Sequence, residues 1–304
     1  MSVSPASPPV SRSYYVDPGN PAAKQAAEWR RSGRPEDAQA MTELAQQPTA
    51  TWIADSVHVS ARVRALVVAA SRAHKTALLV AYYIPGRDCG QFSAGGAPSP
   101  DAYREWVSTF AGAIGSGSAT VIVEPDAVAH AVSGDCGPSD QLASRYALLR
   151  FAVDSFARLP NTTVYLDAGH AGWVQPPTKL VPVLRESGIG SATGFALNVS
   201  NFYATDASIS YGNELSRALG GAHFVIDTSR NGNGPYTKTD GAPNWCNPPG
   251  RAIGDRPTTQ TGQPLVDAYL WIKVPGESDG ACRPGAPAAG VWWPDYALGL
   301  VRNQ

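Results

Sequence analysis

Acidic side chains follow several of the apolar runs in this chain. Asp88, Asp126 and Asp279 each come within a few residues of the end of such a run. Carboxylates gathered on one rim repel one another, so at least one is expected to hold a proton near neutral pH. A protonated carboxylic acid beside ionised carboxylates is the pairing that general acid–base hydrolysis of a glycosidic bond requires. For any single aspartate, the alternative is that it caps the helix that follows its strand.

A metal-dependent hydrolase is the main chemical alternative, because aspartate and histidine at strand ends also bind catalytic metals. Of the five histidines, only His170 stands in a motif at the end of a strand-like run, and no H-x-H or H-E-x-x-H pattern occurs. One histidine among acids is a poor zinc site. We therefore expect neither a metal nor another cofactor. Nucleophilic serine chemistry is disfavoured because the chain has no G-x-S-x-G.

Tryptophans accompany the acids. Trp52, Trp173 and Trp245 stand near strand ends or in loops that flank the acidic residues. Flat aromatic faces stack on the C–H faces of pyranose rings, so these residues predict a cleft for a sugar chain. The alternative is that each packs in the core or in a loop. Trp292 and Trp293 come late in the chain, near no acid, and are assigned to the core or the rim.

Seven short apolar runs alternate with amphipathic stretches. Their composition is typical of parallel strands covered on both faces. The predicted strands are Ala50–Asp55, Ala77–Ile84, Ala119–Val123, Thr163–Leu166, Gly194–Val199, His223–Asp227 and Ala268–Val274. Ser99-Pro100-Asp101 predicts the start of a helix that continues to Ile114. Further helices are predicted around residues 63–70 and over 141–159.

Repeated βα units form a parallel sheet that is either open or closed into a barrel. No G-x-G-x-x-G follows the first strand, and polar residues follow almost every strand. An open sheet would gather its site at one switch point, whereas a barrel builds its site from all the strand ends. The predicted fold class is therefore α/β, a distorted seven-stranded parallel β/α barrel of TIM-like type. Its active site is expected at the C-terminal ends of the strands.

The length and charge of the chain exclude some classes of protein. The 304 residues suit one barrel domain. The net charge is −1 and no basic stripe stands out, which disfavours a nucleic-acid partner. No run of 18 apolar residues predicts a membrane span.

The cysteines and the chain start bear on location and domain organisation. An even set of scattered cysteines and only 16% charged residues favour a secreted protein with two disulfides. The alternative is four free buried thiols in a cytosolic enzyme. Residues 1–13 are rich in Ser and Pro without an apolar signal-peptide core. They are expected to be a linker or a trimmed chain end before one catalytic domain over residues 14–304.

Seven motifs, taken in order, resemble glycoside hydrolase family 6, the cellulases that include endoglucanases and cellobiohydrolases. The resemblance covers the chain from about Tyr14 to Asn303. The motifs are Tyr82–Cys89 (YYIPGRDC), Val123–Asp126 (VEPD), Leu166–Trp173 (LDAGHAGW), Asn198–Asn201 (NVSN), Asp227–Asn231 (DTSRN), Asn244–Cys246 (NWC) and Lys273–Gly280 (KVPGESDG).

The resemblance implies a distorted seven-stranded barrel and hydrolysis with inversion. Asp126 matches the family's general acid. Asp88 matches the aspartate that helps to raise the pKa of that acid and positions water. Asp279 matches the proposed base, which acts through a chain of waters. Tyr82 matches the tyrosine that favours distortion of the sugar at the cleavage point.

The resemblance also implies glucan contacts and disulfides. Glucan-contacting positions are matched by Asp167, His170, Trp173, Asn198, Trp245, Lys273 and Glu277, with Trp52 as an outer stacking site and Arg87 and Ser93 in the loop beside Asp88. The family commonly has Asn where Ala94 stands, so weaker loop contacts are expected there. The implied disulfides are Cys89–Cys136 and Cys246–Cys282.

Loop length separates the modes of action within the family. The intervals Cys89–Cys136 and Cys246–Cys282 look short beside those of tunnel-forming cellobiohydrolases. We predict an open cleft and a monomeric inverting endo-β-1,4-glucanase that acts on β-1,4-glucan or cello-oligosaccharides. The alternatives are a cellobiohydrolase, a member that prefers mixed-linkage glucan or xyloglucan, a metal-dependent hydrolase and a non-catalytic glycan-binding protein.

Overall fold

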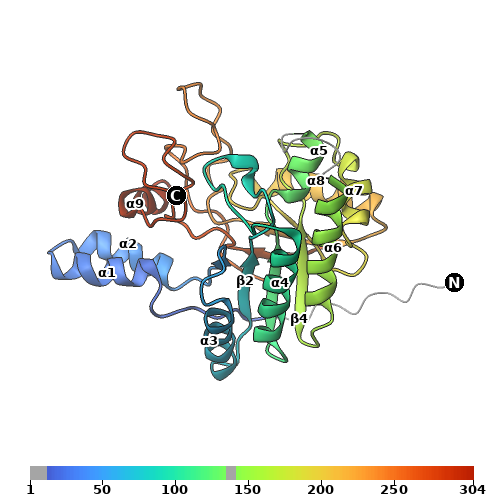
Figure 1. The fold of residues 1–304 in the computed structure, drawn as a ribbon. Coiled ribbons are helices and arrows are strands. Elements are labelled where there is room, and N and C mark those ends of the chain that lie inside the picture. Colours follow the sequence, from blue (N-terminus) through green and yellow to red (C-terminus); the bar gives the residue numbers. More distant parts are fainter. Residues whose placement is uncertain (1–11, 135–141) are drawn as a thin grey trace.

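Seven parallel strands form one curled sheet at the centre of the molecule (Figure 1). The computed structural model describes residues 12–134 and 142–304. Neighbouring strands are hydrogen-bonded in chain order, and each pair is parallel. The strands are β1 (Thr51–Ile53), β2 (Ala77–Ala81), β3 (Ala119–Val123), β4 (Thr162–Asp167), β5 (Gly194–Leu197), β6 (His223–Asp227) and β7 (Val266–Leu270).

The two edges of the sheet meet without forming a full strand pair. Thr49, just before β1, makes an isolated parallel bridge with Trp271, just after β7. The N–H of Ala50 donates to the carbonyl oxygen of Trp271 at 3.0 Å. The Trp52 Nε1–H donates to the carbonyl oxygen of Ile272 at 2.8 Å. The predicted α/β barrel with seven parallel strands is thus confirmed as a curled half-barrel, distorted where β1 faces β7.

Several strands are shorter than the sequence predicts, because their last residues bond to side chains instead of a neighbouring strand. The predicted strand Ala77–Ile84 ends at Ala81. The amides of Tyr83 and Ile84 donate to the buried carboxylate of Glu124 at 3.0–3.1 Å. A polar side chain at the end of one strand therefore takes the place of the last hydrogen bonds between neighbouring strands, and the chain turns away from the sheet at its C-terminal face.

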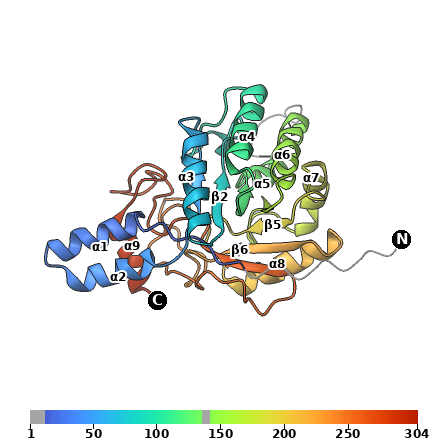
Figure 2. The same ribbon diagram turned by 90° about the horizontal axis from the view of Figure 1, so that it is seen from below.

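Helices cover the outside of the curled sheet (Figures 1 and 2). Their bounds are α3 (Val59–Arg72), α4 (Pro100–Ile114), α5 (Ala127–Ser133), α6 (Leu142–Ala157), α7 (Val181–Glu186) and α8 (Thr205–Ala218), with short 3-10 turns η1 (Asp88–Gly90) and η3 (Pro177–Leu180). The predicted start of α4 is confirmed. Ser99 accepts the N–H of Ala102 at 3.1 Å, and Pro100 is the first helical residue, where a proline loses no hydrogen bond.

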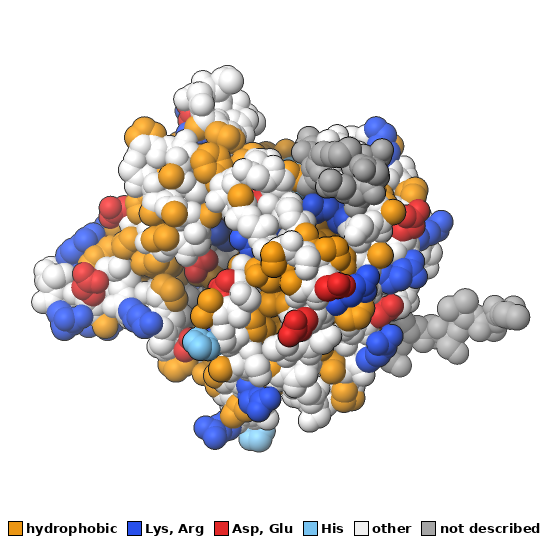
Figure 3. All heavy atoms as spheres, viewed as in Figure 1, with side chains coloured by type: hydrophobic (Ala, Val, Ile, Leu, Met, Phe, Trp, Pro, Cys, Tyr) orange, Lys and Arg blue, Asp and Glu red, His pale blue; other side chains and the backbone are white. Residues whose placement is uncertain are grey.

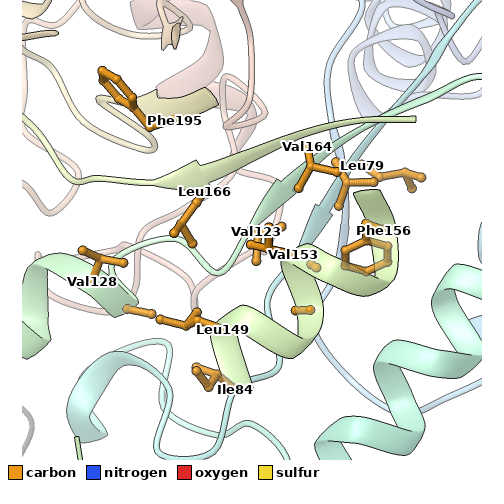
Figure 4. Packing of buried hydrophobic residues seen from close by; sticks show 14 of the residues in the cluster. Leu79, Ile84, Val123, Val128, Leu149, Val153, Phe156, Val164, Leu166 and Phe195 are labelled. Carbon is orange, nitrogen blue, oxygen red and sulfur yellow. The ribbon is translucent and has the colours of Figure 1, made fainter. Parts of the chain in front are cut away.

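Alternation along each strand divides the core into two layers. Leu79 and Ala81 face the helices, whereas Leu78 and Val80 face the interior of the sheet. Figure 4 shows the layer between the sheet and α6. It includes Leu79, Val123 and Val164 from neighbouring strands and Leu149, Val153 and Phe156 from α6, all buried. This packing fixes the strand ends from which the loops at the C-terminal face begin.

A third apolar cluster joins the two ends of the chain. Helices α1 (Pro21–Arg31) and α2 (Pro35–Ala45) pair as a hairpin, and α9 (Pro294–Arg302) packs against it (Figure 2). Trp29, Met41, Trp271 and Leu300 are buried in this cluster. It supports the segment after β7 from the side opposite the sheet interior.

In the face drawn in Figure 3, basic and acidic side chains are interspersed rather than collected in a patch of one sign. Among residues 12–134 and 142–304, no helix is long and apolar enough to cross a membrane.

Candidate active site

A cleft of about 700 Å³ lies at the C-terminal ends of the strands. Twelve of the fourteen predicted site residues line it: Trp52, Tyr82, Arg87, Asp88, Ser93, Asp126, His170, Trp173, Trp245, Lys273, Glu277 and Asp279. The other two, Asp167 and Asn198, are fully buried and do not line the cleft. The structure thus brings together residues spread over more than two hundred positions of the chain.

Asp126 stands at the turn between β3 and α5. Its φ of 71° is left-handed, a conformation that aspartate and asparagine tolerate better than most residues. Its backbone N–H donates to Oδ2 of Asp167 at 2.8 Å. Burial raises the pKa of Asp126 against the opposing effect of His130, and with the added effect of the Asp88 and Asp279 carboxylates the pKa is about 6. This side chain can hold a proton in weakly acidic solution and release it during a reaction.

Asp167 supports Asp126 from below. Its Oδ2 also accepts the N–H of Gly169 at 3.1 Å, while Oδ1 has no hydrogen-bond partner among the described residues. Burial and the neighbouring charge of Asp126 raise the pKa of Asp167 well above its usual range. A neutral carboxyl group leaves no buried charge uncompensated there. Asp167 therefore fixes the backbone of the acid from beneath.

Asp88 approaches Asp126 from the loop after β2. It too has a left-handed φ, of 57°, and its Oδ2 accepts the N–H of Ser93 at 2.6 Å. The Nε2 of His130 lies 3.9 Å from its Oδ1. One potential ligand atom from each of Asp88, Asp126 and His130 lies within 4.8 Å of the other two. These three side chains have the chemistry to hold a divalent cation, and the prediction that the site works without a metal remains a prediction.

Asp279 faces the cleft from the loop after β7 and is held by cationic and amide donors. Its Oδ2 accepts from Nη1 of Arg230 and from the N–H of Asn247, both at 2.9 Å. The Nζ of Lys273 lies 3.9 Å from Oδ1. Arg230 is completely buried, and its guanidinium carbon Cζ lies 4.4 Å from the centre of the Phe202 ring. Burial lowers the pKa of Lys273, which Asp279 partly offsets.

Aromatic side chains line the cleft on both sides of the acids. Tyr82 meets Trp52 edge to face, with ring centres 5.2 Å apart. Trp173 meets His170 at 5.3 Å, and His170 stacks on Tyr203 at 4.8 Å. Burial lowers the pKa of His170 to about 4, so its ring is neutral near pH 6. These planar faces match the predicted stacking surfaces for a sugar chain.

Arg87, Asn198 and Ser93 are tied into the scaffold. The Arg87 guanidinium donates to the carbonyl oxygens of Ser93, Ala54 and Tyr82 at 2.6–2.8 Å. The Asn198 side chain bonds Tyr203 and the carbonyl of Asp227. These contacts hold the three residues in place, and direct contact of any of them with glucan stays a prediction.

Sequence reasoning missed several residues that organise the site. Glu124 precedes the acid in the VEPD motif and accepts the amides of Tyr83 and Ile84 and the Tyr103 hydroxyl. Burial raises the pKa of Glu124 to about 7, although these hydrogen bonds oppose the shift. Its position inside a recognised motif was the available signal.

The other missed residues are His130, Arg230 and Asn247. His130 lies in α5, four positions after Asp126, and its backbone N–H donates to the carbonyl oxygen of Asp126 at 2.9 Å. Arg230 belongs to the DTSRN motif, but nothing in that motif indicates that it bonds Asp279. Asn247 follows the NWC motif in a loop that is distant in sequence from Asp279. Its backbone N–H donates to the Asp279 carboxylate, and its side-chain oxygen accepts the N–H of Asp279.

One predicted disulfide is present in the described residues. Cys246 and Cys282 are joined with their Cα atoms 6.3 Å apart. The bond ties the loop that carries Trp245 to the loop that carries Asp279. For the other predicted pair, Cys89–Cys136, the second cysteine lies outside the described residues, so that pairing stays a prediction.

Known proteins resemble the chain over nearly its whole length. The family described as "Glycosyl hydrolases family 6" matches residues 10–304. Endoglucanase A of Cellulomonas fimi is 44% identical over 97% of this chain, which spans 62% of that relative's length. Endoglucanase 1 of Streptomyces halstedii is 40% identical over 96% of this chain and 89% of its own.

A solved structure is similar to this chain in both fold and sequence. It is the endoglucanase Cel6 from Mycobacterium tuberculosis, in complex with methyl-cellobiosyl-4-deoxy-4-thio-β-D-cellobioside. The two chains are 43% identical, with a TM-score of 0.90, and the match covers 98% of this chain and 99% of that one.

Proposed function

The chain belongs to glycosyl hydrolases family 6, and from that membership we propose that residues 14–304 form an inverting endo-β-1,4-glucanase domain that cuts internal bonds of cellulose-like glucans. The observation that carries the proposal is the carboxyl group of Asp126, whose pKa of about 6 suits proton donation. It lies in a tryptophan-lined cleft with Asp88 beside it and Asp279 on another loop. The thio-linked cellobioside bound by the Mycobacterium tuberculosis relative supports β-1,4-glucan as the partner.

Asp126 acts as the general acid in the proposed reaction. Its proton passes to the glycosidic oxygen, the bond from that oxygen to the anomeric carbon breaks, and a water oxygen bonds to that carbon from the opposite face. The water, positioned by Asp88, loses its proton to Asp279 through a chain of waters. The anomeric configuration inverts, because a single displacement brings the water in on the face opposite the leaving group. After product release, Asp279 returns its proton to solvent and Asp126 takes one up.

The remaining residues bind and orient the glucan in this proposal. Tyr82 lies under the reacting sugar, where its ring favours a distorted conformation. Trp52, Trp173 and Trp245 provide stacking faces. Lys273 and Glu277, which line the same wall as Asp279, hydrogen-bond to sugar hydroxyls.

Endo action and secretion are parts of the proposal with separate support. Two relatives that match more than nine-tenths of the chain bear the name endoglucanase. The Cys246–Cys282 disulfide is typical of proteins that fold in an oxidising compartment. We therefore assign the domain to extracellular polysaccharide degradation.

The proposal is tested by following viscosity and reducing ends together on carboxymethyl-cellulose in the presence of EDTA. A rapid fall in viscosity with few new reducing ends is the expected result for wild type. Asp126→Asn should abolish it, whereas the matched control Asp206→Asn, on the exposed start of α8, should behave as wild type. Loss of activity in EDTA would favour a metal-dependent hydrolase. Reducing ends without viscosity loss would favour a cellobiohydrolase.

A further inference from the structure

Phe92 joins the loop that carries Asp88 to the opposite wall of the cleft. Phe92 is 45% exposed and Trp245 is 36% exposed, although both are large apolar side chains. Their ring centres lie 6.0 Å apart at an interplanar angle of 64°. Phe92 follows β2 along the chain and Trp245 follows β6, and both line the cleft. In Figure 1 the two loops lie at the same upper end of the molecule.

The same ring packs against Gly280, which follows Asp279. A Cβ atom on Gly280 would lie 2.5 Å from Cβ of Phe92, and the φ of Gly280 is +145°. Only a glycine leaves room there for the aromatic side chain. Phe92 therefore touches the backbone of the loop that carries the proposed base.

The wall that Phe92 meets is fixed covalently. Trp245 adjoins Cys246, and Gly280 lies two residues before Cys282, its disulfide partner. Arg283 reinforces this wall by donating to the carbonyl oxygen of Cys246 at 2.7 Å. The contact of Phe92 thus ends on a braced surface.

The loop that Phe92 holds is tied to the acid side of the cleft. The backbone N–H of Ser93, the next residue, donates to the Asp88 carboxylate, and the carbonyl oxygen of Ser93 accepts from the Arg87 guanidinium. A shift of Phe92 would pull on both bonds. The position of the Asp88 carboxylate therefore depends on where this ring sits.

We propose that Phe92 is a positioning residue that locks the Asp88 loop onto the wall formed by Trp245 and Gly280, and so sets Asp88 and Ser93 against Asp279 for hydrolysis. This inference rests on the proposed function for its catalytic consequence, but the contact itself is independent of activity. Without the contact of Phe92 with Trp245 and Gly280, the loop that carries Asp88 occupies its observed conformation for a smaller fraction of the time. Turnover then falls, while the affinity for glucan, which the stacking tryptophans supply, is retained.

Hydrogen exchange tests the lock without reference to activity. In Phe92→Ala, amides of the peptide covering residues 88–96 should exchange about three- to tenfold faster, the range expected for loss of one aromatic contact. Trp245→Ala should speed exchange to a similar extent, and the double variant no further than either single change. Phe92→Tyr should restore the wild-type rate. The control Val68→Ala removes an equally exposed apolar side chain, on α3, and should change nothing.

Kinetics on cellopentaose test the catalytic consequence. Phe92→Ala should lower kcat by about three- to tenfold with KM unchanged, and Phe92→Tyr should restore it. Wild-type exchange rates in Phe92→Ala would overturn the lock. A raised KM at unchanged kcat would show that Phe92 binds sugar instead of positioning the loop. If wild type cleaves no β-1,4-glucan, the proposed function fails, and the exchange data still decide whether the lock exists.

Discussion

Replacing Asp126 with asparagine should lower turnover by orders of magnitude and at the same time stabilise the fold. Asparagine has nearly the same shape, tolerates the left-handed φ of 71° and keeps the backbone N–H that bonds Asp167. What it removes is the titrating proton and the negative charge of a partly buried carboxyl group. The variant therefore isolates the ionisation of this one carboxyl group.

The size of the effect follows from the pKa of Asp126, which is about 6 in the folded protein against 3.8 for an unperturbed aspartate. A difference of about two units corresponds to roughly 3 kcal/mol. Because the folded state has the higher pKa, it binds the proton more tightly, and ionisation of Asp126 opposes folding. This cost is absent below about pH 3.8, grows between pH 3.8 and 6, and is complete at higher pH.

Thermal unfolding at pH 4 and pH 8 measures this cost. Relative to wild type, Asp126→Asn should gain about 3 kcal/mol at pH 8 and less than about 1 kcal/mol at pH 4. In a domain of this size, the gain at pH 8 raises Tm by about 5 °C. Turnover on soluble β-1,4-glucan should fall by about 100- to 10,000-fold, the contribution of a general acid.

Three results would refute the reasoning. An equal change of Tm at both pH values would show that the gain does not come from ionisation. A loss of stability at pH 8 would show that the folded state favours the carboxylate. Retained turnover would remove Asp126 from the role of acid, whatever the unfolding data show. Asp206→Asn controls for the loss of one surface carboxylate.

Two further substitutions test the partners of the acid and the base. Asp88→Asn removes one of the carboxylates that raise the pKa of Asp126, so the alkaline limb of kcat/KM for its residual activity should move down by up to about one pH unit; a limb at the wild-type pH would contradict this. Arg230→Met leaves Asp279 buried without its closest cation, so denaturant unfolding at pH 7 should show a loss of about 3–5 kcal/mol. A loss below about 1 kcal/mol would mean that Lys273 or water replaces the arginine.

The strands and the cleft were predictable because they rest on local patterns. Buried parallel strands are apolar throughout, and polar residues directly after them lie at one end of the sheet. That is why Asp88, Asp126 and Asp279 could be placed on one rim from the sequence. The family motifs then supplied a role for each residue, which spacing alone does not give.

The pairings beneath the rim were not predictable, because they join residues distant in sequence by hydrogen bonds that have no periodicity. Arg230 meets Asp279 across 49 positions, and Glu124 meets Tyr83 across 41. A lone buried arginine or glutamate has the same sequence signature as an exposed one. Strand bounds were misjudged for a related reason, since Glu124 takes the amides that the next rung would have used.

Left-handed backbone outside glycine is concentrated where the chain leaves the strands for the cleft. Six of the nine such residues in the described chain lie there: Asp88, Cys89, Glu124, Asp126, Asn198 and Ser200. Each such conformation costs free energy that the surrounding structure must supply, and here buried carboxyl groups supply it by accepting the displaced amides. Asp167 does so for Asp126, and Asp227 does so for Ser200. Asp126→Ala should therefore be less stable than Asp126→Asn at every pH, since alanine removes the charge but tolerates the turn poorly.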